Sequence, residues 1–147
     1  MILADDASEI LQETSLDESI DVTKRFVKSI PHFGLESIDG IAMLSYYLSH
    51  SDYYVIGTHR QFGVVMQHTD QFPLTSQFYA KLFSGELGYA LVATFTSYPT
   101  LNFGAFTVSF PDDTAEETVQ VFDHPTIYIF KNEARKDDAS IFDIMQL

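Results

Sequence analysis

The segment Asp123-His124-Pro125 places a carboxylate beside an imidazole, between two stretches rich in β-branched and aromatic residues. A carboxylate next to an imidazole can orient the ring, which is the arrangement of a catalytic dyad. Proline lacks a backbone donor, so Pro125 predicts a bulge or an edge position in the surrounding strand. Aspartate and proline are also typical of turns, where the carboxylate accepts hydrogen bonds from backbone amides. The sequence favours the turn, and the dyad remains the alternative.

Other combinations of residues that could catalyse a reaction have less support in the sequence. Glu86 and Asp123 are the acids with mostly apolar neighbours in sequence, and a pair of carboxylates can cleave glycosidic bonds when one of them stays protonated. Whether the two approach one another does not follow from their positions in the chain. A serine hydrolase would need a Gly-x-Ser-x-Gly elbow, which is absent, and Ser84 followed by Gly85 is typical of a helix end. No glycine-rich phosphate-binding loop is present.

The five histidines do not have the helical spacing of a zinc protease. Two local pairs, His50-Ser-Asp52 and His68-Thr-Asp70, could each supply two ligands to a metal ion from an extended segment. Nothing indicates a third ligand for either pair. We therefore expect partly exposed loop histidines, no metal ion and no other cofactor.

Three aromatic doublets could stack against sugar rings: Tyr46-Tyr47, Tyr53-Tyr54 and Phe78-Tyr79. Adjacent residues of a strand face opposite sides, so one ring of such a pair is expected in the core. The other ring could meet a carbohydrate or a partner protein. Core packing is the favoured interpretation.

Composition limits the partners that the chain can bind. Its 147 residues carry a net charge of −13 with only eight Lys and Arg, too few for the basic surface that nucleic acid or an anionic membrane requires. The absence of cysteine excludes disulfides and thiolate chemistry. The first residues do not resemble a signal peptide, and no apolar run is long enough to cross a bilayer.

The elements that would position these residues can be read from periodicity. Residues 1–14 are expected to be an acidic, frayed lead-in, and residues 15–147 a single domain. Ser15 and Glu18 fit a capping box that opens a helix ending at Pro31. A second helix is expected after Asp39 as N-cap. Pro73 is expected to open a third helix, with Gly85 or Gly88 as its C-terminal stop.

The apolar and aromatic run over residues 52–58 predicts a central strand, and residues 59–72 are expected to form a polar loop. Further strands are predicted over residues 89–96, 105–110 and 119–130, and a short terminal helix over residues 137–146. This order predicts an α/β or α+β fold with a small mixed sheet of about four to five strands flanked by helices.

Several of these segments, taken together, resemble a known family. They are Asp52-Tyr-Tyr-Val-Ile-Gly-Thr-His-Arg60, Phe72-Pro-Leu-Thr-Ser, Phe78-Tyr79, Leu82-Phe-Ser-Gly-Glu-Leu-Gly88, Phe95-Thr-Ser-Tyr-Pro99, Ala115-Glu-Glu-Thr-Val, Phe122-Asp-His-Pro125 and Ile127-Tyr-Ile-Phe-Lys131. In this order, over about residues 50–131, they resemble the C-terminal extramembrane domain of multi-pass membrane proteins of the glycosyltransferase family 39-like group. Residues 1–48 add little to the resemblance.

The resemblance implies a lipid-linked sugar donor and a location on the extracytoplasmic face of the membrane. It also implies that the catalytic acids lie in the membrane half, so no catalytic residue is assigned here. The expected partners are that membrane half or neighbouring membrane subunits, and carbohydrate. Candidate binding residues are Arg60, Glu86, Tyr98, Asp123 and His124.

Two other functions stay open. The chain could be a free-standing binding or self-assembly protein that uses an aromatic surface, or a small hydrolase that uses Asp123 with His124, or Glu86.

Overall fold

The computed structural model describes residues 1–5, 27–29, 35–57, 59–96, 100–103, 106–109 and 126–146. Five strands form one sheet in the order β2-β1-β3-β7-β4. These strands are β1 (Ile2–Ala4), β2 (Val27–Ser29), β3 (Tyr53–Ile56), β4 (Tyr89–Phe95) and β7 (Ile127–Asn132). The helices are α2 (Ile38–Ser49), α3 (His59–Gln67), α4 (Pro73–Ser84) and α6 (Asp138–Met145). Strands β5 (Thr100–Phe103) and β6 (Phe106–Ser109) pair in a separate hairpin.

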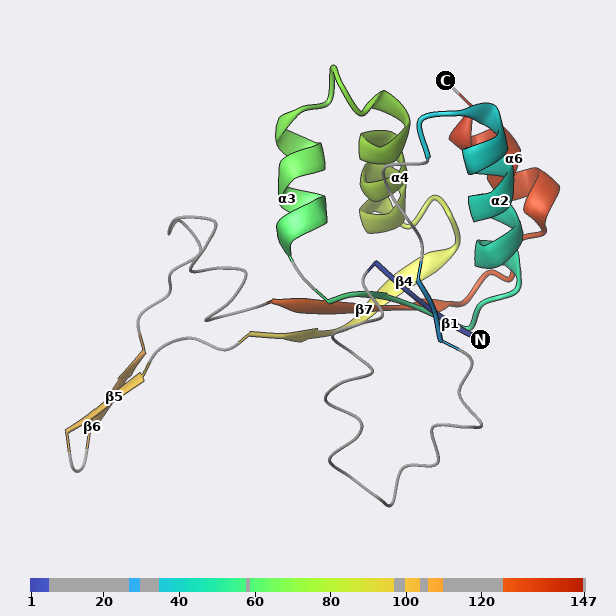
Figure 1. The fold of residues 1–147 in the computed structure, drawn as a ribbon. Coiled ribbons are helices and arrows are strands. Elements are labelled where there is room, and N and C mark those ends of the chain that lie inside the picture. Colours follow the sequence, from blue (N-terminus) through green and yellow to red (C-terminus); the bar gives the residue numbers. More distant parts are fainter. Residues whose placement is uncertain are drawn as a thin grey trace.

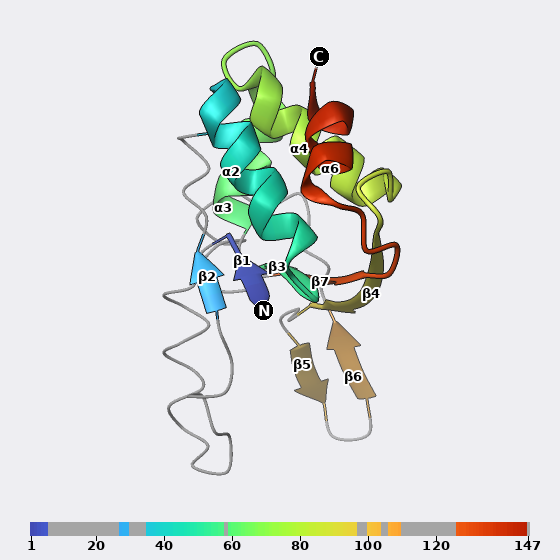
Figure 2. The same ribbon diagram turned by 90° about the vertical axis from the view of Figure 1, so that its right-hand side faces the viewer.

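The helices lie in a layer on one face of the sheet (Figure 1, Figure 2). Strand β1 runs parallel to both β2 and β3, whereas β7 is antiparallel to β3 and to β4. The sheet is therefore mixed. This arrangement confirms the predicted fold class, a small mixed sheet flanked by helices.

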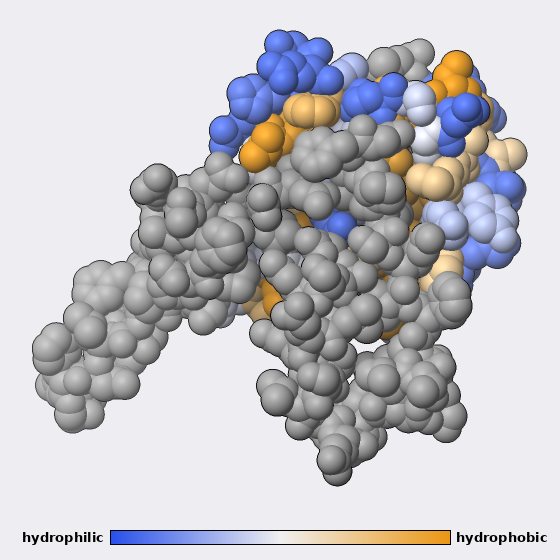
Figure 3. Space-filling model, in the orientation of Figure 1, coloured by the Kyte–Doolittle hydropathy of each residue, from blue (hydrophilic) through white to orange (hydrophobic). Residues whose placement is uncertain are grey.

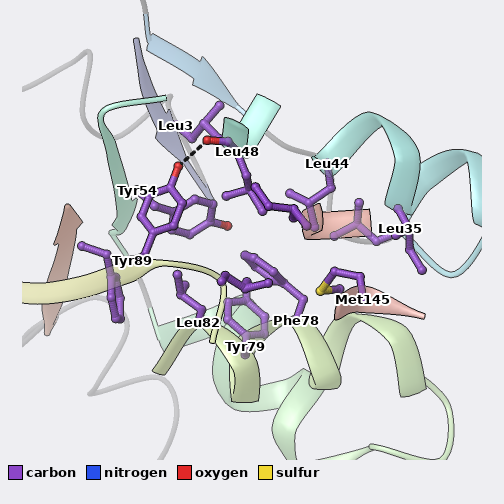
Figure 4. Close-up of a cluster of buried hydrophobic side chains, with 14 of the residues drawn as sticks. Leu3, Leu35, Leu44, Leu48, Tyr54, Phe78, Tyr79, Leu82, Tyr89 and Met145 are labelled. Atoms are coloured by element: carbon purple, nitrogen blue, oxygen red, sulfur yellow. Dashed lines mark hydrogen bonds between the residues drawn. The ribbon is translucent and has the colours of Figure 1, made fainter. Parts of the chain in front are cut away.

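The hydrophobic core fills the space between this sheet and the helices (Figure 4). Its largest fully buried side chains are Tyr54, Tyr79, Tyr89, Phe78, Phe130, Leu3, Leu35, Leu44, Leu48, Ile56 and Leu82. The rings of Tyr54 and Phe78 meet edge to face within it, with centroids 5.4 Å apart. At its border the exposed Phe83 meets the buried Phe130 in the same way, with centroids 5.0 Å apart. Five described rings, those of Tyr54, Phe78, Tyr79, Tyr89 and Phe130, are thus buried in this core.

The predictions with a clear period or a clear stop signal are confirmed. Strand β3 lies between β1 and β7, as expected for a run that is apolar on both faces. The predicted second helix is α2, which buries Ile41, Leu44 and Leu48. Its N-cap is Ser37, whose Oγ accepts a hydrogen bond from Gly40 N at 3.0 Å. The predicted N-cap, Asp39, lies in the first turn. Helix α4 begins at Pro73 and ends at Gly85, which has a φ of 82°.

The prediction of a frayed lead-in is wrong for its first residues. Ile2–Ala4 forms β1 in the interior of the sheet, and Leu3 and Ala4 are fully buried. The apolar run is short and an acidic stretch follows it, so local patterning did not indicate a strand. Parallel partners on both sides stabilise it. Residues 6–14 lie outside the described residues.

The end of the first predicted helix is also wrong. Val27–Ser29 forms β2, with Val27 opposite Ile2 of β1. Valine favours strands as well as fitting a helical stripe, and pairing with a distant strand decides between the two. Residues 15–26, which include the predicted capping box, lie outside the described residues.

The segment 59–72 is not a loop throughout, because His59–Gln67 forms α3. Phe62 packs against the core and Val65 is 2% exposed, so these two residues at helical spacing anchor the helix. Polar flanks and Gly63 in the helix interior concealed the pattern.

A side chain from outside α4 caps that helix. Its own N-cap residue, Phe72, offers no side-chain acceptor. The Glu36 carboxylate instead accepts hydrogen bonds from Leu74 N at 3.1 Å, Thr75 N at 2.9 Å and Thr75 Oγ1 at 2.6 Å. A carboxylate at a helix N-terminus also interacts favourably with the helix dipole. Glu36 thereby fixes the segment before α2 against the start of α4.

Gly88, in the turn that leads into β4, gives the first prediction. Its φ is +85°, and a Cβ there would lie 2.8 Å from the Ala134 Cβ. Gly88→Ala should therefore lower the free energy of unfolding by about 2–3 kcal/mol, from backbone strain and the clash together. Urea denaturation checks this value. Gly85→Ala is the matched control, because Gly85 has a similar φ of +82° but its nearest neighbour would be 3.5 Å away. Equal losses in the two variants would contradict the role of the clash.

Candidate functional site

The most deeply buried charged side chain in the described part of the chain is Asp5, which is 1% exposed. It directly follows β1, and its backbone N donates to Val55 O of β3 at 3.2 Å. The carboxyl ends of parallel strands are where α/β proteins commonly place their sites, and β1 and β3 are parallel here. Helix α3 begins three residues after β3 ends. Asp5 is therefore the first candidate for a functional group.

Two buried tyrosines donate hydrogen bonds to the Asp5 carboxylate. The Tyr54 hydroxyl donates to Oδ1, and the Tyr79 hydroxyl donates to Oδ2 at 2.9 Å. Tyr54 belongs to β3 and Tyr79 to α4, so the carboxylate joins β1, β3 and the helical layer. We call Asp5, Tyr54 and Tyr79 the carboxylate–tyrosine cluster.

The electrostatics of this cluster keep both phenols protonated. Burial raises the pKa of Tyr54 well above its usual value, and the negative charge of Asp5 raises it further. The same two causes, in the same order, raise the pKa of Tyr79. Phenols held in this state donate hydrogen bonds but cannot act as bases near neutral pH. The cluster is suited to holding elements together rather than to moving protons.

A second polar group ties the end of α2 to the sheet. The Tyr89 hydroxyl donates to Leu48 O at 2.7 Å, the contact marked in Figure 4. The Asn132 side-chain amide donates to the carbonyls of Leu48 at 3.2 Å and Ser51 at 3.0 Å. Burial raises the pKa of Tyr89, so this phenol also remains a donor. These bonds join the last turn of α2 and the residue two positions after it to strands β4 and β7.

Of the candidate binding residues, Glu86 is the one whose side chain the structure describes. It lies exposed in the turn after α4 and not in apolar surroundings, and its Oε1 accepts a hydrogen bond from Ser84 Oγ at 2.9 Å. Arg60 lies in α3 rather than in a loop, and its side chain is outside the described part. Tyr98, Asp123 and His124 lie outside the described residues.

Within the described residues, neither His50 with Asp52 nor His68 with Asp70 is joined by a third ligand for a metal ion. His50 is exposed, and its Nδ1 lies 2.8 Å from both Ser49 Oγ and Tyr46 O. Asp52 instead accepts a hydrogen bond from Arg135 Nη2 at 2.6 Å. Among the residues that the structure describes, no group of three or more His, Asp or Glu could hold a metal ion.

The aromatic doublets are mainly part of the core. Tyr54 is fully buried while Tyr53 is 38% exposed, which confirms the prediction for adjacent strand residues. Phe78 and Tyr79 are both buried, because the apolar face of α4 is wide enough for two neighbours. Tyr46, at 52% exposed, is the most open ring of these doublets.

An open groove lies where α2, α4 and α6 meet. It has a volume of about 290 Å³ and is lined by Ile38, Ile41, Leu74, Phe142 and Gln146. Ile38 is 74% exposed, which is the largest exposure among the big apolar residues described. We call these five residues the helical groove. Sequence analysis missed it, because the predicted helix began after Asp39 and so left Ile38 outside, and nothing local marks this residue as part of a surface.

Comparison of the chain with protein-family models, with curated proteins and with solved structures gives no match. Within the described residues, none of the helices combines the length and the apolar character that crossing a membrane demands.

Proposed function

We propose that this chain is a non-catalytic accessory domain of a membrane glycosyltransferase and that it acts by binding. The observation that carries this proposal is that the Asp5 carboxylate is already hydrogen-bonded inside the fold. The buried carboxylate at the carboxyl edge of the parallel strands accepts hydrogen bonds from two tyrosines whose pKa values are raised. A group engaged in this way braces the fold and is poorly suited to accept a proton from a substrate.

The resemblance to the family 39-like extramembrane domain supports the identity of the parent enzyme. Segment 72–88, one of those on which the proposed resemblance rests, coincides with α4 and the turn into β4. Its Phe78 and Leu82 are fully buried, and its Gly88 has a φ that favours glycine. Residues that are buried, or that need a positive φ, are expected at the same places in any chain with the same domain. Their order here therefore supports the proposed resemblance.

In this proposal the membrane half supplies the catalytic carboxylates and binds the lipid-linked sugar on the extracytoplasmic face. The accessory domain holds the acceptor or the sugar near that site. Arg60, Glu86, Tyr98, Asp123 and His124 remain the proposed carbohydrate contacts, and the exposed position of Glu86 is compatible with such a contact.

The test is an activity assay of the purified chain with a polyprenyl-phosphate sugar and a peptide acceptor. We expect neither transfer nor hydrolysis, because the described side chains hold no reactive constellation. Turnover that persists in a His124→Ala variant would contradict a non-catalytic role, and turnover lost in that variant would support the hydrolase alternative. Apolar spans in the same reading frame, upstream of this segment, are expected as well.

Self-association is a second candidate, and one observation favours it. Strand β4 is one of the two edge strands of the sheet, and Leu91, Val92 and Phe95 on it are 47%, 48% and 58% exposed. An exposed apolar edge strand can pair with another copy. Light scattering at rising concentration tests this candidate, and Phe95→Lys should abolish any dimer found. A monomer throughout would dismiss it.

A further inference from the structure

The helical groove is an apolar surface without a described partner on it. Ile41 is 4% exposed and belongs to the core, whereas Ile38 is 74% exposed. An isoleucine this exposed, next to further apolar side chains, is typical of an interaction site rather than of a solvated surface. Figure 3 shows apolar and strongly hydrophilic residues side by side over the region of α2 and α6.

Specific contacts hold the three helices that form the groove. Glu36, two residues before α2, caps the start of α4 through three hydrogen bonds. Lys81 of α4 donates to Ile144 O near the end of α6. Ser37 caps α2. The groove is therefore formed before any partner arrives, which lowers the conformational cost of binding.

The charges beside the groove are negative. Asp39 directly follows Ile38 in α2, and Asp143 directly follows Phe142 in α6, and both are exposed. No Lys or Arg lies within three positions of any lining residue in the sequence. Lys81 is the base that the hydrogen bonds place near α6, and it is engaged with a backbone carbonyl. The described rim of the groove is therefore acidic, in agreement with the net charge of −13 of the whole chain.

We propose that the helical groove docks a short cationic amphipathic segment of a partner protein. One apolar side chain of that segment enters the groove and packs on Ile38, while its Lys or Arg residues lie close to Asp39 and Asp143. A second copy of this chain docked groove to groove would bring its own Asp39 and Asp143 to the same carboxylates, and an anionic membrane would be repelled in the same way. Charge complementarity therefore selects a basic partner.

This inference deepens the proposed function, since it names the surface through which an accessory domain would contact its parent or a neighbouring subunit. The binding itself requires only the groove and its charges. The two proposals can therefore fail separately.

The test uses the full chain and two synthetic peptides of about 14 residues with leucines at helical spacing. One peptide carries lysines at the remaining positions and the other carries glutamates. Fluorescence anisotropy should show binding of the lysine peptide alone, and amide chemical-shift changes should centre on Ile38, Leu74 and Phe142.

Ile38→Ser should weaken binding of the lysine peptide about tenfold through lost apolar contact. Asp39→Asn with Asp143→Asn should weaken it and reduce its dependence on salt.

Tyr46→Ser is the matched control, because Tyr46 is also exposed on α2, at 52%, but does not line the groove. Its affinity for the lysine peptide should equal that of the unaltered chain. Equal affinity for both peptides, or binding that Ile38→Ser leaves unchanged, would overturn the proposal. Two further results would overturn it. One is a dimer of this chain that dissociates in the Ile38→Ser variant, and the other is co-sedimentation with phosphatidylglycerol vesicles that the same variant no longer shows. The lysine peptide could bind at the groove while the encoding reading frame contains no membrane spans. That result would contradict the proposed function but would support this inference.

Discussion

Asp5→Ala is expected to lower the free energy of unfolding by about 3–5 kcal/mol. The change removes the acceptor for two buried phenols, and each donor left without a partner costs about 1–3 kcal/mol. It also removes two hydrogen bonds to a charged group, which are stronger than those to a neutral one. Urea denaturation followed by circular dichroism measures the loss.

Asp143→Ala serves as the control for removing a carboxylate, because Asp143 is exposed on α6. Its effect should stay within about 0.5 kcal/mol. A double-mutant cycle with Tyr79→Phe makes the test specific to the carboxylate–tyrosine cluster. Tyr79→Phe should cost less in the Asp5→Ala background than in the unaltered chain, because the bond that it removes is already lost. Additive effects, or an Asp5→Ala variant as stable as the Asp143→Ala control, would show that the cluster does not brace the fold.

The second large effect is a loss of stability at alkaline pH. Burial raises the pKa of Tyr54, Tyr79 and Tyr89 in the folded state. In the unfolded chain these phenols titrate near pH 10. Above that pH the unfolded state has released three protons that the folded state retains, so the free energy of unfolding falls as pH rises. The expected slope is about −4 kcal/mol per pH unit, and the stabilisation is fully present below about pH 10.

Urea midpoints between about pH 9 and pH 11.5 measure this slope. Tyr79→Phe should reduce it to about −3 kcal/mol per pH unit, because one of the three groups no longer titrates in the unfolded chain. Tyr46→Phe, at the exposed end of α2, is the control and should leave the slope unchanged. A flat profile up to pH 11 would mean that the three phenols ionise in the folded protein as readily as in the unfolded chain.

Local patterns predicted those elements whose own residues determine them. Pro73 and Gly85 delimit α4 at both ends, and the run over β3 is apolar on both faces. Strand β1 and the segment Val27–Ser29 were not predicted, because three residues each are too few to show a period. Their conformation depends on pairing with each other and with β3. Helix α3 is intermediate, since Phe62 and Val65 carry its pattern but its ends have no clear signals.

The carboxylate–tyrosine cluster was harder to find than the fold. Its members are 49 and 74 positions apart in the chain, so no motif joins them. The three apolar residues before Asp5 are a signal that could have indicated a strand with an acid at its carboxyl end. The two tyrosines could not have been assigned to that acid without the sheet order. Candidates such as Glu86 were chosen from apolar sequence neighbours, which do not determine what surrounds a turn residue in space.

The position of β7 has a consequence for how the chain acquires its structure. This strand is the last of the sheet to be synthesised, yet it lies between β3 and β4. Until residues 127–132 leave the ribosome, β3 lacks its neighbour on that side and β4 has none in the sheet. Two apolar edges stay open during translation, which calls for a chaperone or for fast synthesis of the last segment. Contacts this distant in sequence also slow the search for the native pairing, so folding in milliseconds to seconds is expected, rather than microseconds.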